Sequence, residues 1–320
     1  MRRSVPSPQA AFPSSAHRDR HSSDAGRTRR SLILVTLVCL TVLGSAGTPA
    51  GAQTERVLLV GDSWAQFMWF DRTLETVFAA NGRPDLIERG AATAIGGSTA
   101  AEWATPAWLQ QIDVELDAAP TIDVVQLTIG GNDFLAGQPG GGWFVGMPDP
   151  DFVALRQRIS ADTATVVDHL LAREPPLEVL ISLYDYTNFE DAVLPTCPGA
   201  WNDLGQPTPI EINTAALVLQ DDADALAASR ERTTSIAHSG AMQELVGTIP
   251  IGTPVPPGDV AQPSPIETMR FGIDCFHLSI AGYETLGQRL WDGFYDRHFN
   301  GTLFADGFES GNLSAWASPP

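Results

Sequence analysis

Residues 122–133 read IDVVQLTIGGND, and this stretch decides the fold class. Its first part, Ile122 to Ile129, is a nearly continuous apolar run bounded by a glycine pair, which is typical of a strand buried on both faces. The run leads directly into Gly130-Gly131-Asn132-Asp133, so polar side chains follow the carboxyl end of the predicted strand. Strands of this kind occur in parallel sheets that helices cover on both faces.

Similar runs occur on either side of this strand in the chain. Arg56 to Val60 ends at Gly61-Asp62-Ser63, Leu86 to Ala92 forms a second strand region, and Leu177 to Tyr184 forms a fourth strand. Apolar residues at helical spacing predict helices between the strands. They cover residues 64–80, 100–118 with a break near Pro106, 152–173, most of 210–246, and 280–294, with irregular chain over 188–209 and 250–265. This alternation predicts an α/β fold with a parallel sheet covered on both faces.

The composition excludes several classes of protein. The chain has 320 residues, of which 43% are hydrophobic and 18% are charged, so it can form a substantial core in one large domain or two small ones. A fully disordered chain, a coiled coil and collagen are excluded. All 19 basic residues are Arg, which removes Schiff-base chemistry on a lysine and a P-loop lysine from consideration.

The charge is unevenly distributed along the chain. The formal net charge is −19, but seven Arg lie within residues 1–30. The remaining residues carry 12 Arg against 36 acidic residues. Such a surface repels phosphate backbones, so we expect no nucleic-acid partner.

The N-terminal segment has the order of a signal peptide. Residues 1–30 are rich in Ser, Pro and Arg, Leu32 to Leu43 is apolar, and Ala50-Gly51-Ala52 supplies a small-x-small cleavage site. We therefore assign residues 1–52 to a signal peptide with a long basic leader. The apolar run has 12 residues, whereas a membrane-spanning helix needs about 20, so an uncleaved anchor is the weaker alternative.

The remaining chain divides into one domain and a tail. Residues 53–300 are predicted to form a single domain, and residues 301–320 an acidic appendage to which we assign no chemistry. No other segment approaches membrane-spanning length, so no stable membrane insertion is expected after signal cleavage, and the mature protein should be secreted or periplasmic. Residues 28–32 match a twin-arginine signal only in part, which leaves the export route open.

The residues that could carry chemistry follow predicted strands or precede the last helix. Ser63 follows the first strand and starts a helix, where free backbone N–H groups suit a nucleophile, although a serine at this place could equally be a helix N-cap. Gly97, in Gly96-Gly97-Ser98-Thr99, permits a backbone N–H to point into a site, or forms only a flexible turn. Asn132 can offer its side-chain NH₂ to an oxyanion, or belong to a turn.

A carboxylate and a histidine lie three residues apart before the last helix. Asp274 can hold one ring nitrogen of His277 and leave the other free as a base. The other histidines of the mature chain, His169, His238 and His298, are interpreted as structural or surface residues. No Cys-x-x-Cys pair or histidine-rich cluster argues for zinc.

The four motifs in this order resemble those of the SGNH hydrolases, also called the GDSL esterase/lipase family. The resemblance spans residues 56 to about 296 and is closest in Gly130-x-Asn132-Asp133 and in Asp274-x-x-His277. The first motif departs slightly, because Trp64 stands where the family name has Leu. The resemblance implies a three-layer α/β/α sandwich with a central parallel sheet, of flavodoxin-like type.

The resemblance also implies a role for each motif residue. Ser63 would be the nucleophile, His277 the general base and acid, and Asp274 the residue that orients His277. The oxyanion hole would comprise the backbone N–H groups of Ser63 and Gly97 and the side chain of Asn132. No metal or organic cofactor is implied, because the triad activates its own nucleophile.

The substrate is less well specified than the reaction. We expect an exported serine esterase or lipase that acts on a small-molecule or glycan ester, with Trp64 and Trp143 as candidate substrate-binding residues. Trp143 lies in a Gly- and Pro-rich aromatic stretch, residues 135–152, that could cover an acyl group or serve as an ordinary surface connection. The alternatives are a carbohydrate O-deacetylase of the same family and a non-catalytic carbohydrate-binding protein. Oligomeric state, acyl chain length and natural substrate are not specified by the sequence.

Two of the three cysteines survive removal of the signal. Cys39 leaves with the signal peptide, and Cys197 and Cys275 form an even pair in an oxidising compartment. We therefore expect a disulfide that ties a Pro-rich irregular stretch to the loop of Asp274 and His277. The alternative is two free thiols, with Cys275 buried as a small apolar residue.

Export leads to a first prediction. The mature protein recovered outside the cytoplasm should begin near Gln53, because cleavage follows Ala52. Intact-mass spectrometry of that protein checks the new N-terminus. Recovery of a chain that keeps residues 31–52 would favour a membrane anchor instead.

Overall fold

The computed structural model describes residues 52–301, so nearly all of the predicted signal peptide and of the predicted tail lies outside the described residues. Five parallel strands form one sheet in the order β2-β1-β3-β4-β5. The strands are β1 (Thr54–Gly61), β2 (Leu86–Arg89), β3 (Val124–Thr128), β4 (Glu178–Ser182) and β5 (Thr233–Ile236). The chain goes from β1 to the edge strand β2 and then crosses over β1 to β3, β4 and β5. The strands β1 and β3 are therefore neighbours inside the sheet.

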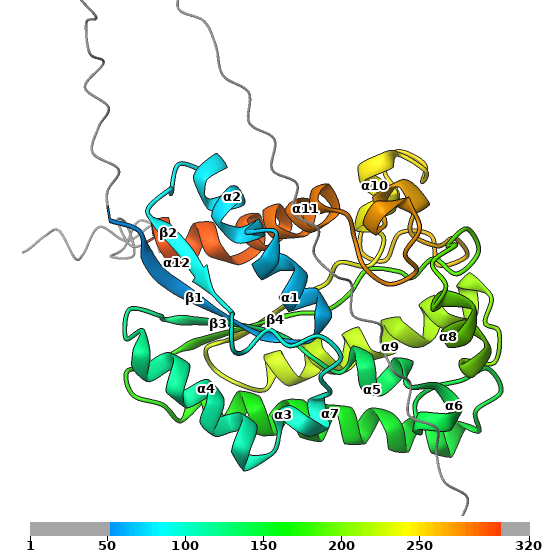
Figure 1. The fold of residues 1–320 in the computed structure, drawn as a ribbon, viewed down its shortest axis with the longest axis horizontal. Coiled ribbons are helices and arrows are strands. Elements are labelled where there is room, and N and C mark those ends of the chain that lie inside the picture. Colours follow the sequence, from blue (N-terminus) through cyan, green and yellow to red (C-terminus); the bar gives the residue numbers. More distant parts are fainter. Residues whose placement is uncertain (1–51, 302–320) are drawn as a thin grey trace, which may run out of the picture. The chain divides into compact units, whose positions relative to one another are not determined.

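Helices cover both faces of this sheet, which makes the fold a three-layer α/β/α sandwich (Figure 1). One layer contains α1 (Ser63–Phe70), α2 (Thr73–Ala80) and α11 (Ile280–Leu290), which continues through a π-helical turn, η3 (Trp291–Tyr295), into α12 (Asp296–Asn300). The other layer contains α3 (Ala100–Trp103), α4 (Pro106–Ala118), α7 (Asp149–Leu171) and α9 (Pro209–Ala228). The short remaining elements are α5 (Gly131–Leu135), α6 (Gly137–Gly140), α8 (Cys197–Asp203), α10 (Ala241–Val246), η1 (Ile266–Thr268) and η2 (Arg270–Gly272).

The central strands are apolar because both of their faces are buried. In β1, Val57 and Leu59 pack under α1, α2 and α11, whereas Leu58 and Val60 pack against the helices of the opposite layer. All four side chains are fully buried. Alternate residues therefore enter two separate cores, and a continuous apolar run is what such a strand requires.

The predicted helix over residues 64–80 is wrong as a single element. The chain turns between α1 and α2, where Arg72 adopts left-handed backbone angles with φ of 52°. The turn places Asp71 against Arg270, whose guanidinium donates to both carboxylate oxygens at 2.8 and 3.3 Å. This contact joins residues 199 positions apart, so local spacing gives no sign of the break.

The prediction of mostly helix over residues 210–246 missed an edge strand. Residues 233–236 form β5, which pairs in parallel with β4. All four residues of β5 are only partly buried, since the strand has a neighbour on one side alone. The sequence Thr-Thr-Ser-Ile therefore lacks the apolar run that identifies the central strands. Residues 188–209 were predicted to be irregular, but they contain α8.

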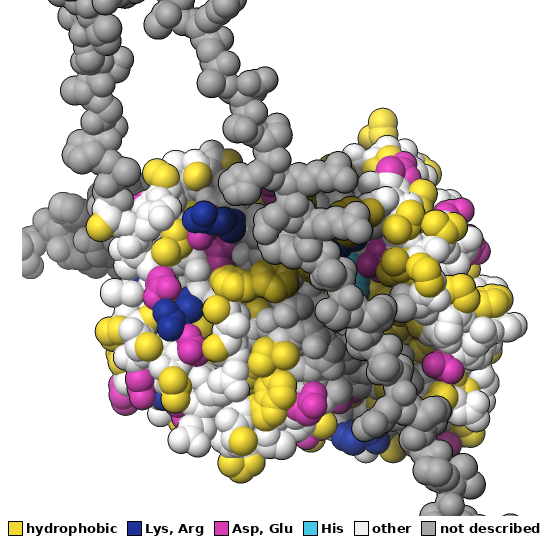
Figure 2. Space-filling view, in the orientation of Figure 1, with side chains coloured by type: hydrophobic (Ala, Val, Ile, Leu, Met, Phe, Trp, Pro, Cys, Tyr) yellow, Lys and Arg dark blue, Asp and Glu magenta, His cyan; other side chains and the backbone are white. Residues whose placement is uncertain are grey.

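The described surface contains few unpaired basic groups. Nine arginines form ion pairs with carboxylates: Arg56, Arg72, Arg83, Arg89, Arg156, Arg173, Arg230, Arg270 and Arg289. On the face in Figure 2, the basic side chains accordingly lie beside acidic ones. None of the helices within residues 52–301 combines the length and apolar character that are needed to span a bilayer.

One carboxyl group is buried in the core beneath α2. Glu88, on β2, is 5% exposed and follows Leu86 on the same face of the strand. Burial raises the pKa of Glu88 from 4.5 to about 8, and the neighbouring Glu75 carboxylate adds to the rise. Glu88 is therefore a neutral acid in the folded protein at neutral pH.

The raised pKa predicts a pH-dependent stability. Because the folded pKa lies above the unfolded value of 4.5, the contribution of Glu88 is fully favourable below pH 4.5 and is lost as the pH rises through about 8. The variant Glu88→Gln, which does not ionise, should gain stability over the natural protein progressively from about pH 5 to 8. Urea unfolding at several pH values measures the difference, with Glu231→Gln at an exposed glutamate as the control. A difference that does not change with pH would contradict a neutral Glu88.

Candidate active site

The first motif forms a tight turn between β1 and α1. A Cβ atom on Gly61 would lie 2.2 Å from the carbonyl oxygen of Thr128 on the neighbouring strand, so the turn requires glycine. Asp62 is the N-cap of α1, because its Oδ1 accepts the N–H of Trp64 at 2.9 Å. The alternative that Ser63 is the N-cap is therefore wrong. Ser63 is the first residue of α1, and its hydroxyl is free for another partner.

The structure brings Ser63, His277 and Asp274 into one hydrogen-bonded chain. His277 Nε2 lies 2.8 Å from Ser63 Oγ, and His277 Nδ1 lies 2.9 Å from Asp274 Oδ2. Ser63 and His277 are 214 residues apart in the sequence. With Nδ1–H donating to the carboxylate, Nε2 is the acceptor for the serine hydroxyl proton.

Asp274 is held as a carboxylate by the loop that carries it. Its Oδ1 accepts the backbone N–H groups of Phe276 at 2.8 Å and His277 at 3.2 Å, while Oδ2 faces the imidazole. Burial alone would raise the pKa of Asp274, but the hydrogen bonds from the His277 ring and from these N–H groups outweigh it and lower the pKa below its ordinary value. The group is therefore ionised where it can orient His277.

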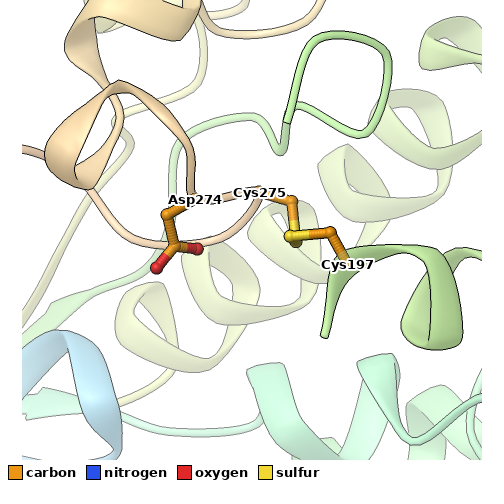
Figure 3. A group of neighbouring side chains, drawn as sticks. All are labelled: Cys197, Asp274 and Cys275. Atoms are coloured by element: carbon orange, nitrogen blue, oxygen red, sulfur yellow. A yellow bond between two sulfur atoms is a disulfide. The ribbon is translucent and has the colours of Figure 1, made fainter. Parts of the chain in front are cut away.

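The expected disulfide between Cys197 and Cys275 is present. It joins the N-terminus of α8 to the loop between Asp274 and His277, and Figure 3 shows the bond and the Asp274 carboxyl group on neighbouring residues of that loop. The two sulfurs are bonded to each other, so this cluster of Cys197, Asp274 and Cys275 offers no free thiolate for a metal ion. Backbone hydrogen bonds from Val193 and Leu194 to the Ile273 carbonyl add to the attachment.

The three predicted donors of the oxyanion hole lie in one cavity. Ser63, Gly97 and Asn132 all line one cavity of about 410 Å³, together with His277. The backbone N–H groups of Ser63 and Gly97 donate to no other group within residues 52–301. Gly97 has φ of +81°, a left-handed conformation that glycine adopts without strain.

Asn132 is oriented by the second motif. Its Nδ2 donates to the carbonyl oxygen of Ser98 at 2.9 Å, and an amide nitrogen carries a second hydrogen that remains available to a ligand. Asp133 reinforces this arrangement, because its Oδ2 accepts the N–H of Ala100 at the start of α3 at 2.7 Å. Two hydrogen bonds thus connect the third motif to the chain around the second motif, one from Asn132 and one to Asp133.

Sequence reasoning missed the group that joins the first motif to the third. The Tyr184 hydroxyl donates to Asp62 Oδ2 at 2.6 Å and accepts the N–H of Gly131 at 2.9 Å. Burial, and then the Asp62 carboxylate, raise the pKa of Tyr184 well above its ordinary value, so the phenol remains a donor. Burial also raises the pKa of Asp62 to about 6, although the hydrogen bonds from Tyr184 and Trp64 oppose it. Tyr184 lies at the carboxyl end of a predicted strand, and this position was the one sign in the sequence that it could belong to the site.

A second missed contact packs the histidine ring. The Phe67 ring meets the His277 ring edge to face, with centroids 4.9 Å apart. The Arg270 guanidinium lies 3.9 Å from the centroid of Phe67, held there by Asp71. The sequence placed Phe67 only within a predicted helix over residues 64–80, and nothing in the sequence relates it to a loop 200 residues away.

The two candidate substrate-binding tryptophans do not occupy equivalent positions. Trp64 lines the Ser63 cavity but is only 6% exposed, because it packs edge-on between Tyr184 and Tyr283. Trp143 does not line that cavity. It stacks on Phe134 and lines a different hollow on the side of α9, so residues 135–152 do not bring an aromatic cover to Ser63.

The other three histidines lie away from this cavity. His238 is fully buried with Nε2 2.9 Å from Ser182 Oγ, and burial lowers its pKa to about 3, so it is neutral. His169 pairs with Asp113, and His298 pairs with Asp123. These contacts agree with the structural and surface roles that the sequence analysis assigned.

The position of the disulfide predicts how reduction acts. If the Ser63–His277–Asp274 chain catalyses a reaction, reducing the bond should lower its rate before the protein unfolds, because the bond secures the loop that carries Asp274 and His277. Activity and near-ultraviolet circular dichroism should be followed together during titration with a thiol reductant, and the paired variant Cys197→Ser/Cys275→Ser should behave like the reduced protein. Simultaneous loss of activity and tertiary signal would contradict a local effect.

Comparisons with known proteins find similarity to solved structures. No family model and no curated protein matches the chain. Solved structures with a similar chain trace include a carbohydrate acetylesterase family member from Sinorhizobium meliloti (15% identity, 78% of this chain, 100% of that chain, TM-score 0.45). Others are an aryl esterase from M. smegmatis (16%, 76% and 99%, TM-score 0.45) and a lipase from a goat rumen metagenome (13%, 76% and 98%, TM-score 0.46).

At these identities and TM-scores, the activities of those proteins are not assigned to this chain. The strand order, the two helical layers and the position of each motif at the carboxyl edge of the sheet are observed in the chain itself. In fold and in the order of its four motifs, the chain resembles the SGNH hydrolases.

Proposed function

We propose that this protein is a serine hydrolase that cleaves carboxylic esters through an acyl-enzyme. The observation that carries the proposal is the chain from Ser63 Oγ to His277 Nε2 at 2.8 Å and from His277 Nδ1 to Asp274 Oδ2 at 2.9 Å. A hydroxyl, a base within hydrogen-bonding reach and a carboxylate that orients the base are what nucleophilic catalysis by serine requires.

In the first step, Ser63 Oγ attacks the ester carbonyl carbon while His277 Nε2 takes the hydroxyl proton. The imidazolium that forms is stabilised by Asp274, whose pKa is lowered in this environment. His277 then gives the proton to the alkoxide, which leaves as an alcohol. In the second step, His277 activates water to cleave the acyl-enzyme and releases the acid.

The negative charge of each tetrahedral intermediate falls on the former carbonyl oxygen. The N–H groups of Ser63 and Gly97 and the second amide hydrogen of Asn132 are the proposed donors to that oxygen. None of the three has to give up a protein partner, so the site is preorganised for the charge.

The triad geometry favours an enzyme over a carbohydrate-binding module. A binding module needs exposed aromatic platforms, whereas Trp64 and Trp143 are 6% and 7% exposed. Such a module also has no use for a serine held at hydrogen-bonding distance from a histidine. Export to an oxidising compartment remains part of the proposal, and the disulfide supports it.

The nucleophile can be tested directly. A fluorophosphonate probe should add covalently to Ser63, and peptide mass spectrometry should locate the adduct there. Ser63→Ala should remain folded, take up no probe and lose about 10⁶-fold in kcat on an aryl ester. Ser229→Ala, at an exposed serine at the end of α9, is the control and should keep full activity. More than a few per cent of activity in pure Ser63→Ala would refute the assignment.

The oxyanion hole gives a separate prediction. Asn132→Ala removes one donor to the developing charge, so kcat should fall about 10²–10³-fold with a much smaller change in KM. Steady-state kinetics on the same aryl ester separates the two constants. A rise in KM with kcat unchanged would mean that Asn132 binds the substrate and does not stabilise the transition state.

A further inference from the structure

A second, much smaller cavity adjoins the one that contains Ser63. It measures about 50 Å³, against about 410 Å³ for the larger one. The two cavities share five lining residues, namely Gly131, Leu135, Tyr184, Asp185 and Thr187. We name the smaller one the side cavity. Its lining includes Gly131 at the start of α5 and Ile212, Leu219 and Gln220 on α9.

The chemistry of the proposed reaction determines which part of an ester lies on this side. His277 must protonate the leaving alkoxide, so the alcohol part of the ester lies toward His277 and Phe276, which line only the larger cavity. The acyl chain leaves the carbonyl carbon in another direction. The side cavity is lined by Gly131, the residue before Asn132, and is available to the acyl chain.

The size of the side cavity limits what it holds. A volume of about 10–15 Å³ on this measure accommodates one water-sized group, so the side cavity takes on the order of four non-hydrogen atoms. Its walls are mainly apolar and include Phe134, Leu183, Ile212 and Leu219. A short chain therefore fits, and a long one does not unless the walls move.

Two buried polar atoms, each on a residue that lines the side cavity, have no partner within the described residues. They are Gln220 Oε1 and Thr187 Oγ1, and Gln220 is 6% exposed. The Gln220 amide nitrogen already donates to Asp224 Oδ1 at 2.7 Å and to Ser235 Oγ at 3.0 Å, which fixes the oxygen as the free end of the amide. A buried amide oxygen needs a donor, and a hydroxyl group supplies one.

The charges around the side cavity exclude an anionic chain. Asp185 lines both cavities and is 5% exposed, with its oxygens accepting the N–H groups of Tyr186, Gly240 and Met242, each at 2.7 Å. No arginine is among the residues that line either cavity. A carboxylate or phosphate on the acyl chain would have no counter-ion here.

We propose that the side cavity is the acyl-binding subsite and that it selects a short, uncharged hydroxyacyl group whose hydroxyl donates to Gln220 Oε1. This inference rests on the proposed function and adds the substrate class to it. The preferred substrates are then esters of short hydroxy acids, and Leu219 and Gln220 determine the preference.

The length limit is tested with p-nitrophenyl acetate, butyrate and octanoate, which share one leaving group. The natural protein should hydrolyse butyrate with a kcat/KM at least about 10-fold above that for octanoate, as expected for a hydrophobic pocket that is too small. Leu219→Ala should reduce this ratio about 10-fold or more. Leu217→Ala makes the same change on the same helix at a residue that lines neither cavity, and it should leave the ratio unchanged.

The hydroxyl contact is tested with ethyl 3-hydroxybutyrate and ethyl butyrate, followed by acid release at constant pH. The natural protein should prefer the hydroxy ester, and Gln220→Met should bring the ratio of kcat/KM for the two esters close to one. Ser235→Ala removes a partner of the Gln220 nitrogen but keeps the oxygen, so it should retain the preference.

The outcomes separate this inference from the proposed function. Failure of the fluorophosphonate to label Ser63, with no hydrolysis of any ester, would overturn both. Normal labelling with equal rates on butyrate and octanoate, or with equal rates on the two ethyl esters, would overturn the subsite alone. A Leu219→Ala variant whose preference changes with the alcohol part and not with the acyl part would also overturn it.

Discussion

The rest of the site depends on the close approach of the ends of β1 and β3. Gly61 lies so near the Thr128 carbonyl that no side chain fits between them, and the N–H of Asp62 donates to the same carbonyl at 3.0 Å. The two central strands therefore end side by side. Ser63 and Asn132 follow these ends directly, which sets the distance between the proposed nucleophile and its oxyanion donor before any side chain is considered.

Hydrogen bonds then extend this arrangement outward. Tyr184, after β4, spans from Asp62 to the Gly131 N–H, and a Cβ on Gly131 would lie 2.5 Å from its ring. Asp133 fixes the start of α3, and thereby the turn that contains Gly97. Each of the three loops at this edge of the sheet is thus positioned by its neighbour. The loop that contains Asp274 and His277 is not positioned by these three loops. It is held by the packing of Phe67 against His277, by Arg270 on Phe67, and by the disulfide.

The sequence predicted the parts of the fold that depend on burial and on local turns. Three central strands and the long helix α7 were identified because continuous apolar runs and helical spacing are local signals. The four motifs were found because glycine and polar residues follow those strands. The break at Arg72, the edge strand β5 and the role of Tyr184 were missed. Each depends on a partner far away in the sequence, such as Arg270 for Asp71 or Gly131 for Tyr184, and no local pattern reports such a partner.

The disulfide also determines what happens to the protein when its chain is cut. The bond closes a ring of residues 197–275 that contains α9, β5 and α10. A single peptide-bond cleavage inside that ring leaves both fragments attached through sulfur. The segment that contains His277 then stays joined to the part of the chain that contains Ser63, so a protease that cuts one loop of the ring would not by itself separate the two halves of the proposed triad.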